Sequence, residues 1–151
     1  MEILKADIND CEEIINVQKA AFLGQAKIYN DYNLPPLLQT VEDFKKEFNN
    51  FVILKATEGN RITGSIRAHE KDKTCFISRL IVHPDYQNKG LGAKLLIGME
   101  NIFKEKHITT FKLFTGEKSK RNLYLYQKHG YKITKKEQMG NINIVFMEKT
   151  Q

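Results

Sequence analysis

Cysteines and long apolar runs are both scarce in this chain. Its two cysteines, Cys11 and Cys75, form no Cys-x-x-Cys pair, and no stretch of about 18 consecutive apolar residues occurs. Residues 1–5 lack the pattern of a secretory signal peptide. These absences argue against a disulfide framework, a cysteine-based metal or redox motif and a membrane-spanning helix. We therefore expect a cytoplasmic protein with no metal and no membrane partner, in which both thiols are free and buried.

Repeats and linkers are also missing. No internal repeat or low-complexity tract interrupts the 151 residues, a length that suits one domain with a sizeable core. Apolar residues make up 41% of the chain and charged residues 28%, which is ordinary for a globular protein. We expect a single domain over residues 1–151.

Acidic residues are outnumbered by basic ones. The chain has 24 Lys and Arg against 18 Asp and Glu, a formal net charge of +6, so its surface should attract polyanions. A nucleic-acid-binding domain is one alternative, on the strength of Lys118, Lys120, Arg121, Lys135 and Lys136. However, the basic residues are spread along the chain and no nucleic-acid motif accompanies them. We expect no nucleic-acid partner.

Residues 79–96 have the pattern of a strand, a glycine loop and the start of a helix. The strand comes from residues 74–82, whose side chains alternate, and Pro84 ends it because proline has no N–H to donate. Apolar residues then recur at helical spacing over residues 91–103. Gly90 and Gly92 stand at the helix entrance, where unpaired N–H groups and the helix dipole favour a phosphate.

Two common phosphate-binding loops do not match this stretch. A P-loop needs Lys-Ser or Lys-Thr after the glycines, and a dinucleotide-binding fingerprint needs a small residue where this chain has Leu95. What remains is Gln87-x-x-Gly90-x-Gly92 after an apolar strand and a proline. This pattern resembles the acetyl-CoA loop of the GNAT (Gcn5-related) N-acetyltransferase family.

The resemblance implies that acetyl-CoA is the co-substrate. Backbone N–H groups of the loop would hold its pyrophosphate, and Leu80, Ile81 and Val82 would lie along the pantetheine and the thioester. The loop residues implied are Gln87, Asn88, Lys89, Gly90, Leu91, Gly92, Ala93 and Lys94.

The predicted elements extend over the whole chain. Helices are expected over residues 11–22, 40–49, 91–103 and 122–129, the first capped by Asp10 and Glu13, with residues 24–39 as a loop that contains a short turn of helix. Strands are expected over residues 2–6, 51–57, 61–69, 74–82, 109–114, 131–136 and 141–149. This order is also that of the GNAT family. It predicts an α/β (α+β) fold with a mixed, mainly antiparallel central sheet of about seven strands flanked by four helices.

A second motif lies in residues 116–131. It resembles the GNAT segment Leu-Tyr-x-x-x-Gly-Phe/Tyr, and Tyr126 falls on the tyrosine that commonly points at the CoA sulfur. The resemblance makes Tyr126 the catalytic residue, as a hydrogen-bond donor to the leaving thiolate, while we take Tyr124 and Tyr131 as structural. Many members have Asn seven residues before this tyrosine, where this chain has Ser119, so Ser119 and Asn122 both remain candidates for contact with CoA.

Acetyl transfer to an amine needs a neutral amine, a stabilised oxyanion and a stabilised thiolate. A lysine-like amine with a pKa of about 10.4 costs about 4.6 kcal/mol to deprotonate near neutral pH, so we expect a base or a water relay. A backbone N–H near Leu80 to Val82, where the central strand splays from its neighbour, could stabilise the oxyanion through a hydrogen bond. His69, Glu70 and His83 end predicted strands and are candidates for the base.

The acceptor is harder to identify. In GNAT relatives the region between the first two helices covers it, and here that region contains Tyr29, Asp31 and Tyr32, which together with Glu70 would suit a cationic amine. Ordinary loop anchoring explains these residues equally well. The closing hairpin, residues 131–149, is apolar enough either for a homodimer surface or for core strands, so the oligomeric state stays open.

The sequence therefore predicts an N-acetyltransferase that moves the acetyl group of acetyl-CoA directly to a primary amine of a small molecule or peptide. The alternative is a non-catalytic module on the same fold that binds or senses CoA. In both alternatives the glycine loop binds CoA, and they differ in whether the protein also binds an amine acceptor.

Overall fold

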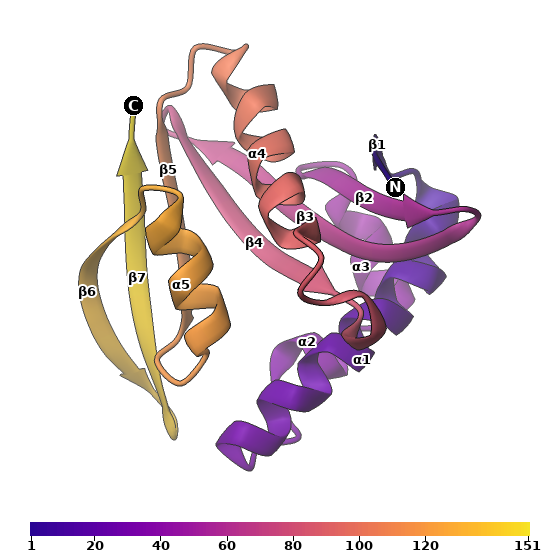
Figure 1. The fold of residues 1–151 in the computed structure, drawn as a ribbon, viewed down its shortest axis with the longest axis horizontal. Helices are drawn as coiled ribbons and strands as arrows, with labels where there is room; N and C mark the ends of the chain where they lie inside the picture. The colour runs from indigo at the N-terminus through magenta and orange to yellow at the C-terminus, as the bar shows by residue number, and fades with distance from the viewer.

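One open sheet runs through the computed structural model, which describes residues 1–151 (Figure 1). Its strand order is β1-β2-β3-β4-β5-β7-β6. All neighbouring strands are antiparallel except β4 and β5, which are parallel. The strands are β1 Glu2–Lys5, β2 Val52–Glu58, β3 Arg61–Lys71, β4 Thr74–Val82, β5 Thr110–Gly116, β6 Lys132–Met139 and β7 Ile142–Thr150. The predicted mixed, mainly antiparallel sheet is confirmed.

Helices cover both faces of the sheet. Helices α4 and α5 lie on the face turned toward the viewer in Figure 1, and α1, α2 and α3 lie behind the sheet. The helices are α1 Cys11–Tyr29, α2 Pro35–Leu38, α3 Val41–Glu47, α4 Leu91–Lys104 and α5 Lys120–Lys128. The four predicted helices are present, and the short α2 lies where a turn of helix was expected. No helix combines the length and the apolar character needed to cross a membrane.

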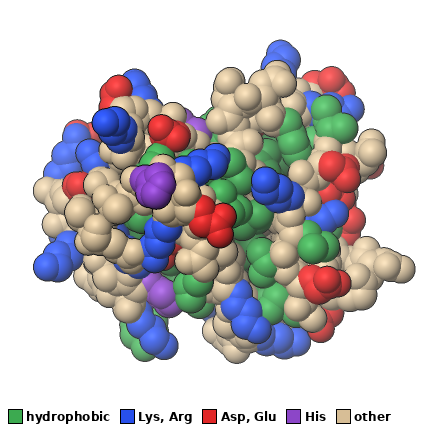
Figure 2. Space-filling model, turned by 90° about the horizontal axis from the view of Figure 1, so that it is seen from above, with side chains coloured by type: hydrophobic (Ala, Val, Ile, Leu, Met, Phe, Trp, Pro, Cys, Tyr) green, Lys and Arg blue, Asp and Glu red, His purple; other side chains and the backbone are tan.

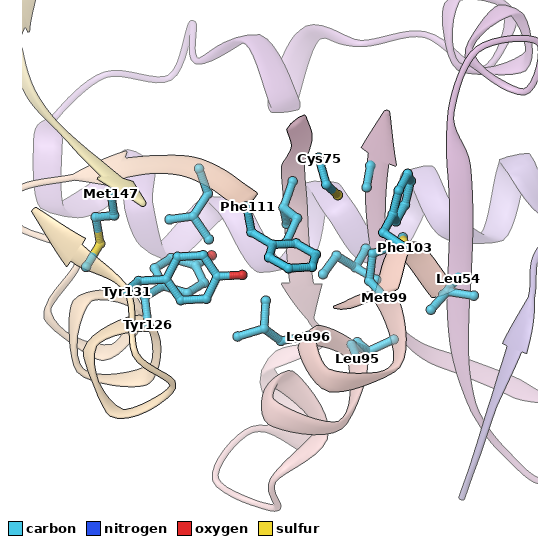
Figure 3. Packing of buried hydrophobic residues seen from close by; sticks show 14 of the residues in the cluster. Leu54, Cys75, Leu95, Leu96, Met99, Phe103, Phe111, Tyr126, Tyr131 and Met147 are labelled. Carbon is cyan, nitrogen blue, oxygen red and sulfur yellow. The ribbon is translucent and has the colours of Figure 1, made fainter. Parts of the chain in front are cut away.

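Each face of the sheet has its own apolar core. Leu95, Met99 and Phe103 of α4 pack on one face, against Cys75 and Phe111 (Figure 3). On the other face α1 and α3 bury Ile14, Ile15 and Phe44 against β2 and β4. Both cysteines are free and buried, as predicted. At about 25 cal/mol per Å² of apolar surface, these two layers supply the main stabilisation of the fold.

The first helix is longer than the sequence indicated. We expected it to end near residue 22, but α1 continues to Tyr29 and closes at Asn30, whose φ of 49° is left-handed. Gly24 costs such a helix only about 1 kcal/mol, and the burial of Ala26 compensates. Residues 24–29 are therefore helix and not loop, and the prediction was wrong there.

Asp10 is the N-cap residue of α1, as predicted, but the predicted capping box with Glu13 is not formed. Asp7 and Asp10 form a capping box around the 3-10 turn Ile8–Asp10 that precedes α1, and Asp10 makes no side-chain cap bond to α1 itself. Glu13 instead accepts a hydrogen bond of 2.7 Å from the backbone N–H of Ile62 on β3. A long-range contact thus replaces the local one that the spacing indicated.

The sheet opens between β4 and β5. These strands pair only over Thr74–Phe76 and Thr110–Lys112, and beyond them they diverge in Figure 1. A register shift between β3 and β4 makes a bulge on β4 at the same level, where Arg79 has a φ of 51°. The splay expected near Leu80 to Val82 is therefore present, and the far half of β4 has no strand beside it on that side.

Candidate active site

A groove of about 910 Å³ lies between α1, the carboxyl end of β4, the loop before α4, and α5. It takes up the space that the splayed strands leave. Its lining includes every cofactor-binding residue predicted from the sequence except Lys89 and Lys94: Leu80, Ile81, Val82, Gln87, Asn88, Gly90, Leu91, Gly92, Ala93, Ser119 and Asn122. Segments far apart in the sequence thus meet in one cavity.

The glycine loop presents free backbone donors to this groove. Gly90 is the N-cap of α4 with a φ of 82°, and the first bond of the helix runs from the Lys94 N–H to the Gly90 carbonyl at 3.2 Å. Leu91, Gly92 and Ala93 therefore have N–H groups without an acceptor inside the helix. The N–H of Lys94, which the sequence analysis counted among the phosphate donors, is already used.

Gln87 lines the groove and also fixes the loop. Its amide nitrogen donates to the Val82 carbonyl at 3.2 Å, and its amide oxygen accepts from Arg121 of α5. The glutamine of the motif thus joins the end of β4 to the helix across the groove. The partnership with Arg121 was missed by the sequence analysis because the two residues are far apart in the chain.

The groove is strongly cationic. Lys118, Lys120, Arg121 and Lys128 line it, and none of its 24 lining residues is Asp or Glu. On the face of the molecule drawn in Figure 2, by contrast, basic and acidic side chains are interspersed. A local excess of four positive charges beside free N–H donors suits a ligand with several phosphates.

The carboxyl half of α1 closes the groove on one side. Ser119 donates from its hydroxyl to Gln25 at 2.7 Å, and the Tyr29 hydroxyl accepts from the Lys118 N–H at 2.8 Å. Asn122 contacts Thr115 at 3.4 Å. Ser119 and Asn122 both face the groove, so either side chain can reach a bound ligand. The part played by α1 was not predicted, because these residues were assigned to a loop.

Tyr126 lies behind the wall of the groove. Its side chain is 5% exposed and belongs to the apolar core, with its ring 5.9 Å from that of Tyr131 (Figure 3). Burial raises the pKa of Tyr126 above its ordinary value. Tyr131 donates its hydroxyl to Glu100 at 2.7 Å and is structural, as expected. Tyr124, by contrast, is 67% exposed and lines the groove, so the structural role expected for it is wrong.

The predicted acceptor residues do not come together in one place. Tyr29 is the last residue of α1, and its hydroxyl accepts a hydrogen bond from the Lys118 N–H. Asp31 accepts a hydrogen bond of 2.9 Å from the Asn33 N–H in a local turn. Tyr32 is exposed. Glu70 pairs with Cys75 near the start of β4, at the end of the strand away from the groove.

The two histidines named as candidate bases differ in their surroundings. His83 accepts a hydrogen bond from the Asp85 N–H at 3.1 Å and so caps the turn Pro84–Tyr86. His69 packs its ring against Phe51 and Phe76, and its Nδ1 is buried without a partner. No group of three or more His, Cys, Asp or Glu side chains is arranged to hold a metal ion.

Comparison with known sequences agrees with this arrangement. The sequence model described as the acetyltransferase (GNAT) family matches residues 11–131. The spermidine N(1)-acetyltransferase of Thermoplasma acidophilum is 25% identical over an alignment of 143 residues, which covers 88% of this chain and 89% of that protein.

Solved structures share the fold. The PaiA N-acetyltransferase of Thermoplasma acidophilum in complex with coenzyme A has a TM-score of 0.80 at 23% identity, over 99% of this chain and 98% of that one. The ribosomal-protein-alanine N-acetyltransferase of Brucella melitensis has a TM-score of 0.81 at 15% identity, over 100% of both chains. With a family match that extends from α1 to the end of α5 and a fold shared over the whole chain, this protein belongs to the GNAT acetyltransferase family.

Proposed function

We propose that the protein is an N-acetyltransferase that moves the acetyl group of acetyl-CoA directly to a primary amine of a small molecule or peptide. The observation that carries the proposal is the groove. The start of α4 supplies free N–H donors, and the lining has four cationic side chains and no carboxylate. Beside them β4 has an open edge. A polyphosphate with a long, uncharged arm fits that combination.

The donor would lie with its pyrophosphate on the N–H groups of Leu91, Gly92 and Ala93. Lys118, Lys120 and Arg121 are close enough in the lining to meet its phosphates. The pantetheine arm would then follow β4 beyond the splay, where the backbone has no neighbouring strand. With the pyrophosphate on the loop and the pantetheine along β4, the thioester would lie at the bulge of β4.

The chemistry at the bulge needs few side chains. The neutral amine attacks the thioester carbonyl, the C–S bond breaks and the sulfur leaves as a thiolate that takes up a proton. A backbone N–H on the unpaired side of β4, near Leu80 to Val82, would stabilise the oxyanion. A water relay would remove the amine proton, since none of the candidate bases His69, Glu70 and His83 lines the groove.

Tyr126 would act as a hydrogen-bond donor to the thiolate and not as a full acid. Its pKa is raised by burial, which moves it further above that of a thiol, about 8.5, and so makes complete proton transfer less favourable. Tyr29 and Tyr131 have their hydroxyls engaged with Lys118 and Glu100. Because Tyr126 is buried, the end of the pantetheine arm would have to extend from the groove as far as its hydroxyl.

A second candidate function is a non-catalytic module that binds CoA. The observation that favours it is that Tyr126 lies outside the lining of the groove, so the donor could bind without contact to a proton donor. In that case CoA and acetyl-CoA would bind with similar affinity and no acceptor would be acetylated.

A thiol-release assay with acetyl-CoA separates the two functions. Polyamines, aminoglycosides, amino acids and peptides serve as acceptors, and a reaction without acceptor measures thioester hydrolysis. Release that depends on one acceptor class, with an acetylated product seen by mass spectrometry, supports the transferase. Calorimetric binding of CoA with no release above the acceptor-free control across the panel would support the binding module instead.

A further inference from the structure

Arg79 is a charged side chain without a partner in the protein. Its Nη1 is buried and has no hydrogen-bond acceptor. The residue as a whole is partly exposed. A buried guanidinium nitrogen normally has an acceptor, because its desolvation is otherwise uncompensated.

The backbone at Arg79 is strained as well. Its φ of 51° lies in the left-handed region, which residues other than glycine rarely adopt. The bulge of β4 imposes this conformation, and the next residue, Leu80, is the first of β4 to line the groove. An unpaired charge and a strained backbone therefore coincide one residue before the part of β4 along which the thioester is proposed to lie. Such a coincidence is typical of a binding residue.

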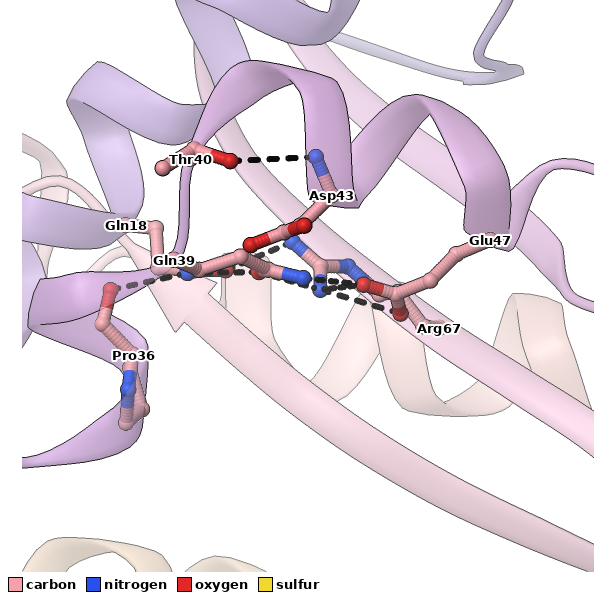
Figure 4. A network of polar contacts seen from close by, with 7 residues as sticks. All are labelled: Gln18, Pro36, Gln39, Thr40, Asp43, Glu47 and Arg67. Carbon is pink, nitrogen blue, oxygen red and sulfur yellow. Dashed lines mark hydrogen bonds and ion pairs between the residues drawn. The ribbon is translucent and has the colours of Figure 1, made fainter.

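The carboxylate whose charge acts on Arg79, that of Glu47, is already used by another arginine. Arg67 on β3 donates from Nη1 to both oxygens of Glu47, each at 3.2 Å (Figure 4). Its guanidinium lies 3.8 Å from the centre of the Phe44 ring. Burial lowers the pKa of Arg67 to about 10, so it stays charged at neutral pH. Two arginines thus face one carboxylate, which leaves a positive charge in excess.

The strand register shows which part of β5 lies across the opening from this part of β4. Phe76 of β4 is level with Lys112 of β5 at the last paired position. Continued by two residues beyond the paired segment, this register would set Phe114 across from Ser78, the residue before Arg79. The Phe114 ring is 55% exposed and packs against Phe146 at 5.6 Å. Arg79 and Phe114 therefore belong to the two strands that border the splay, one on each side of its opening.

We propose that Arg79 binds a carboxylate of the acceptor, so that the substrate is an amino acid, or another amine with a carboxylate near its amino group, whose apolar part packs on Phe114. This inference rests on the proposed transferase function. A guanidinium pairs with a carboxylate through two parallel hydrogen bonds. A polyamine, the substrate class in the name of the Thermoplasma relative, would instead bring more positive charge to a site that already has an excess.

Matched acceptors test the proposal in the unaltered protein. Phenylalanine and 2-phenylethylamine differ by one carboxylate, as do lysine and 1,5-diaminopentane. Thiol release should give a kcat/KM, corrected for the fraction of neutral amine, at least about tenfold higher for each amino acid than for its decarboxylated partner. Equal values, or a preference for the amines, would overturn the inference while leaving the transferase function intact.

An Arg79 variant tests the assignment to this residue. Arg79→Gln should reduce the ratio of kcat/KM between phenylalanine and 2-phenylethylamine by at least about tenfold, mainly through the KM for phenylalanine. Lys71→Gln removes a charge from the exposed end of β3 and should leave the ratio unchanged. A ratio that is unaffected by Arg79→Gln, in a variant that still binds CoA, would show that another group binds the carboxylate.

A binding measurement keeps the inference testable if no acceptor turns over. Calorimetry on the CoA-bound protein compares N-acetylphenylalanine with N-acetyl-2-phenylethylamine. Tighter binding of the carboxylate compound that is lost in Arg79→Gln would support the inference even if the transferase function fails. Equal binding of the two compounds would overturn it.

Discussion

At the scale of single residues, Gly90 is needed for its backbone conformation and not for space. A Cβ there would meet no atom within 4 Å, but the φ of 82° is unfavourable for any other residue. Relief of that strain would rotate the backbone and turn the N–H groups of Leu91 to Ala93 away from the phosphates. Gly140, in the β6–β7 turn, has a φ of 63° and equally open surroundings, and it lies outside the groove.

This pair gives a matched test of the phosphate loop. Gly90→Ala and Gly140→Ala should each lower the free energy of unfolding by about 1 kcal/mol. Only Gly90→Ala should weaken CoA binding, by about tenfold, as measured by calorimetry beside urea denaturation of both variants. Equal CoA affinity in the two variants would remove Gly90 from the binding site.

Tyr126 and Tyr131 offer a second comparison, between a proposed catalytic hydroxyl and a structural one. Tyr126→Phe should lower kcat by about tenfold or more, since a hydrogen bond to a charged group is lost, while CoA affinity stays within about twofold of the original value. Tyr131→Phe removes the hydrogen bond from Tyr131 to Glu100 and leaves Lys149 as the side chain that donates to this carboxylate. This variant should lower the free energy of unfolding by about 1–3 kcal/mol without a specific effect on kcat. Unchanged turnover in Tyr126→Phe would exclude it from the mechanism.

The residues that the sequence predicted best are those whose neighbours are also close in the chain. Gln87, Gly90 and Gly92 act within one short loop, and their spacing contains most of the information needed. Arg79 is different, because its left-handed backbone depends on a register shift against β3. Its position in an alternating strand pattern gave no sign of the bulge.

At the scale of elements, one of the contacts that close the groove lies between α1 and β5. The Tyr29 hydroxyl lies so close to Gly116 that a Cβ at position 116 would be 2.1 Å from it. Tyr29 comes from the segment of α1 that sequence patterns assigned to a loop, and its partner Lys118 is 89 residues away. Local propensity could not indicate this helix end, since packing against a distant strand decides it.

Gly116→Ala tests whether this contact shapes the groove. The new methyl group should displace Tyr29, release the last turn of α1 and lower the free energy of unfolding by about 1–3 kcal/mol, with weaker CoA binding. Gly98→Ala is the control: its Cβ would lie 3.5 Å from Ile3 and Leu54, an ordinary contact inside α4, so stability should be unchanged or slightly higher.

A double variant completes this test. Tyr29→Ala removes the ring that blocks the new methyl group, so the cost of Gly116→Ala should be smaller in the Tyr29→Ala background. The two changes should therefore be non-additive in urea denaturation. Additive losses would mean that Gly116 is required for a reason other than its contact with Tyr29.

At the scale of the whole molecule, the two sides of the splay differ in how far the sequence predicts them. The donor side is continuous from β4 through the loop into α4, and its pattern resembles that of the family. The proposed acceptor side would draw on β3, β4, β5, α1 and α3, so its residues become neighbours only through the fold. This explains why the predicted acceptor residues Tyr29, Asp31, Tyr32 and Glu70 are dispersed while most of the predicted cofactor-binding residues meet in one groove.

The buried acids also make the stability of the whole fold depend on pH. Burial, with the charges of Glu100 and Glu70, raises the pKa of Cys75 to about 12, and burial raises that of Cys11. The unfolded chain releases these protons near pH 9, where the folded protein still holds them. The contribution of the two cysteines to the free energy of unfolding should therefore be constant below about pH 8 and fall as the pH rises, by up to about 1.4 kcal/mol per pH unit for each cysteine.

Urea denaturation between about pH 8 and about pH 10 measures this slope. The contribution of Arg67 to this slope has the opposite sign. Its pKa is lowered to about 10, so the folded state loses this proton before the unfolded state does, but this contribution falls above the pH range of the measurement. Replacing both cysteines with alanine should flatten the pH dependence while lowering stability at neutral pH through the lost packing. If the slope persisted in the double variant, the tyrosines Tyr126 and Tyr131, whose pKa values burial also raises, would have to account for it, and the cysteines would not be the groups that titrate.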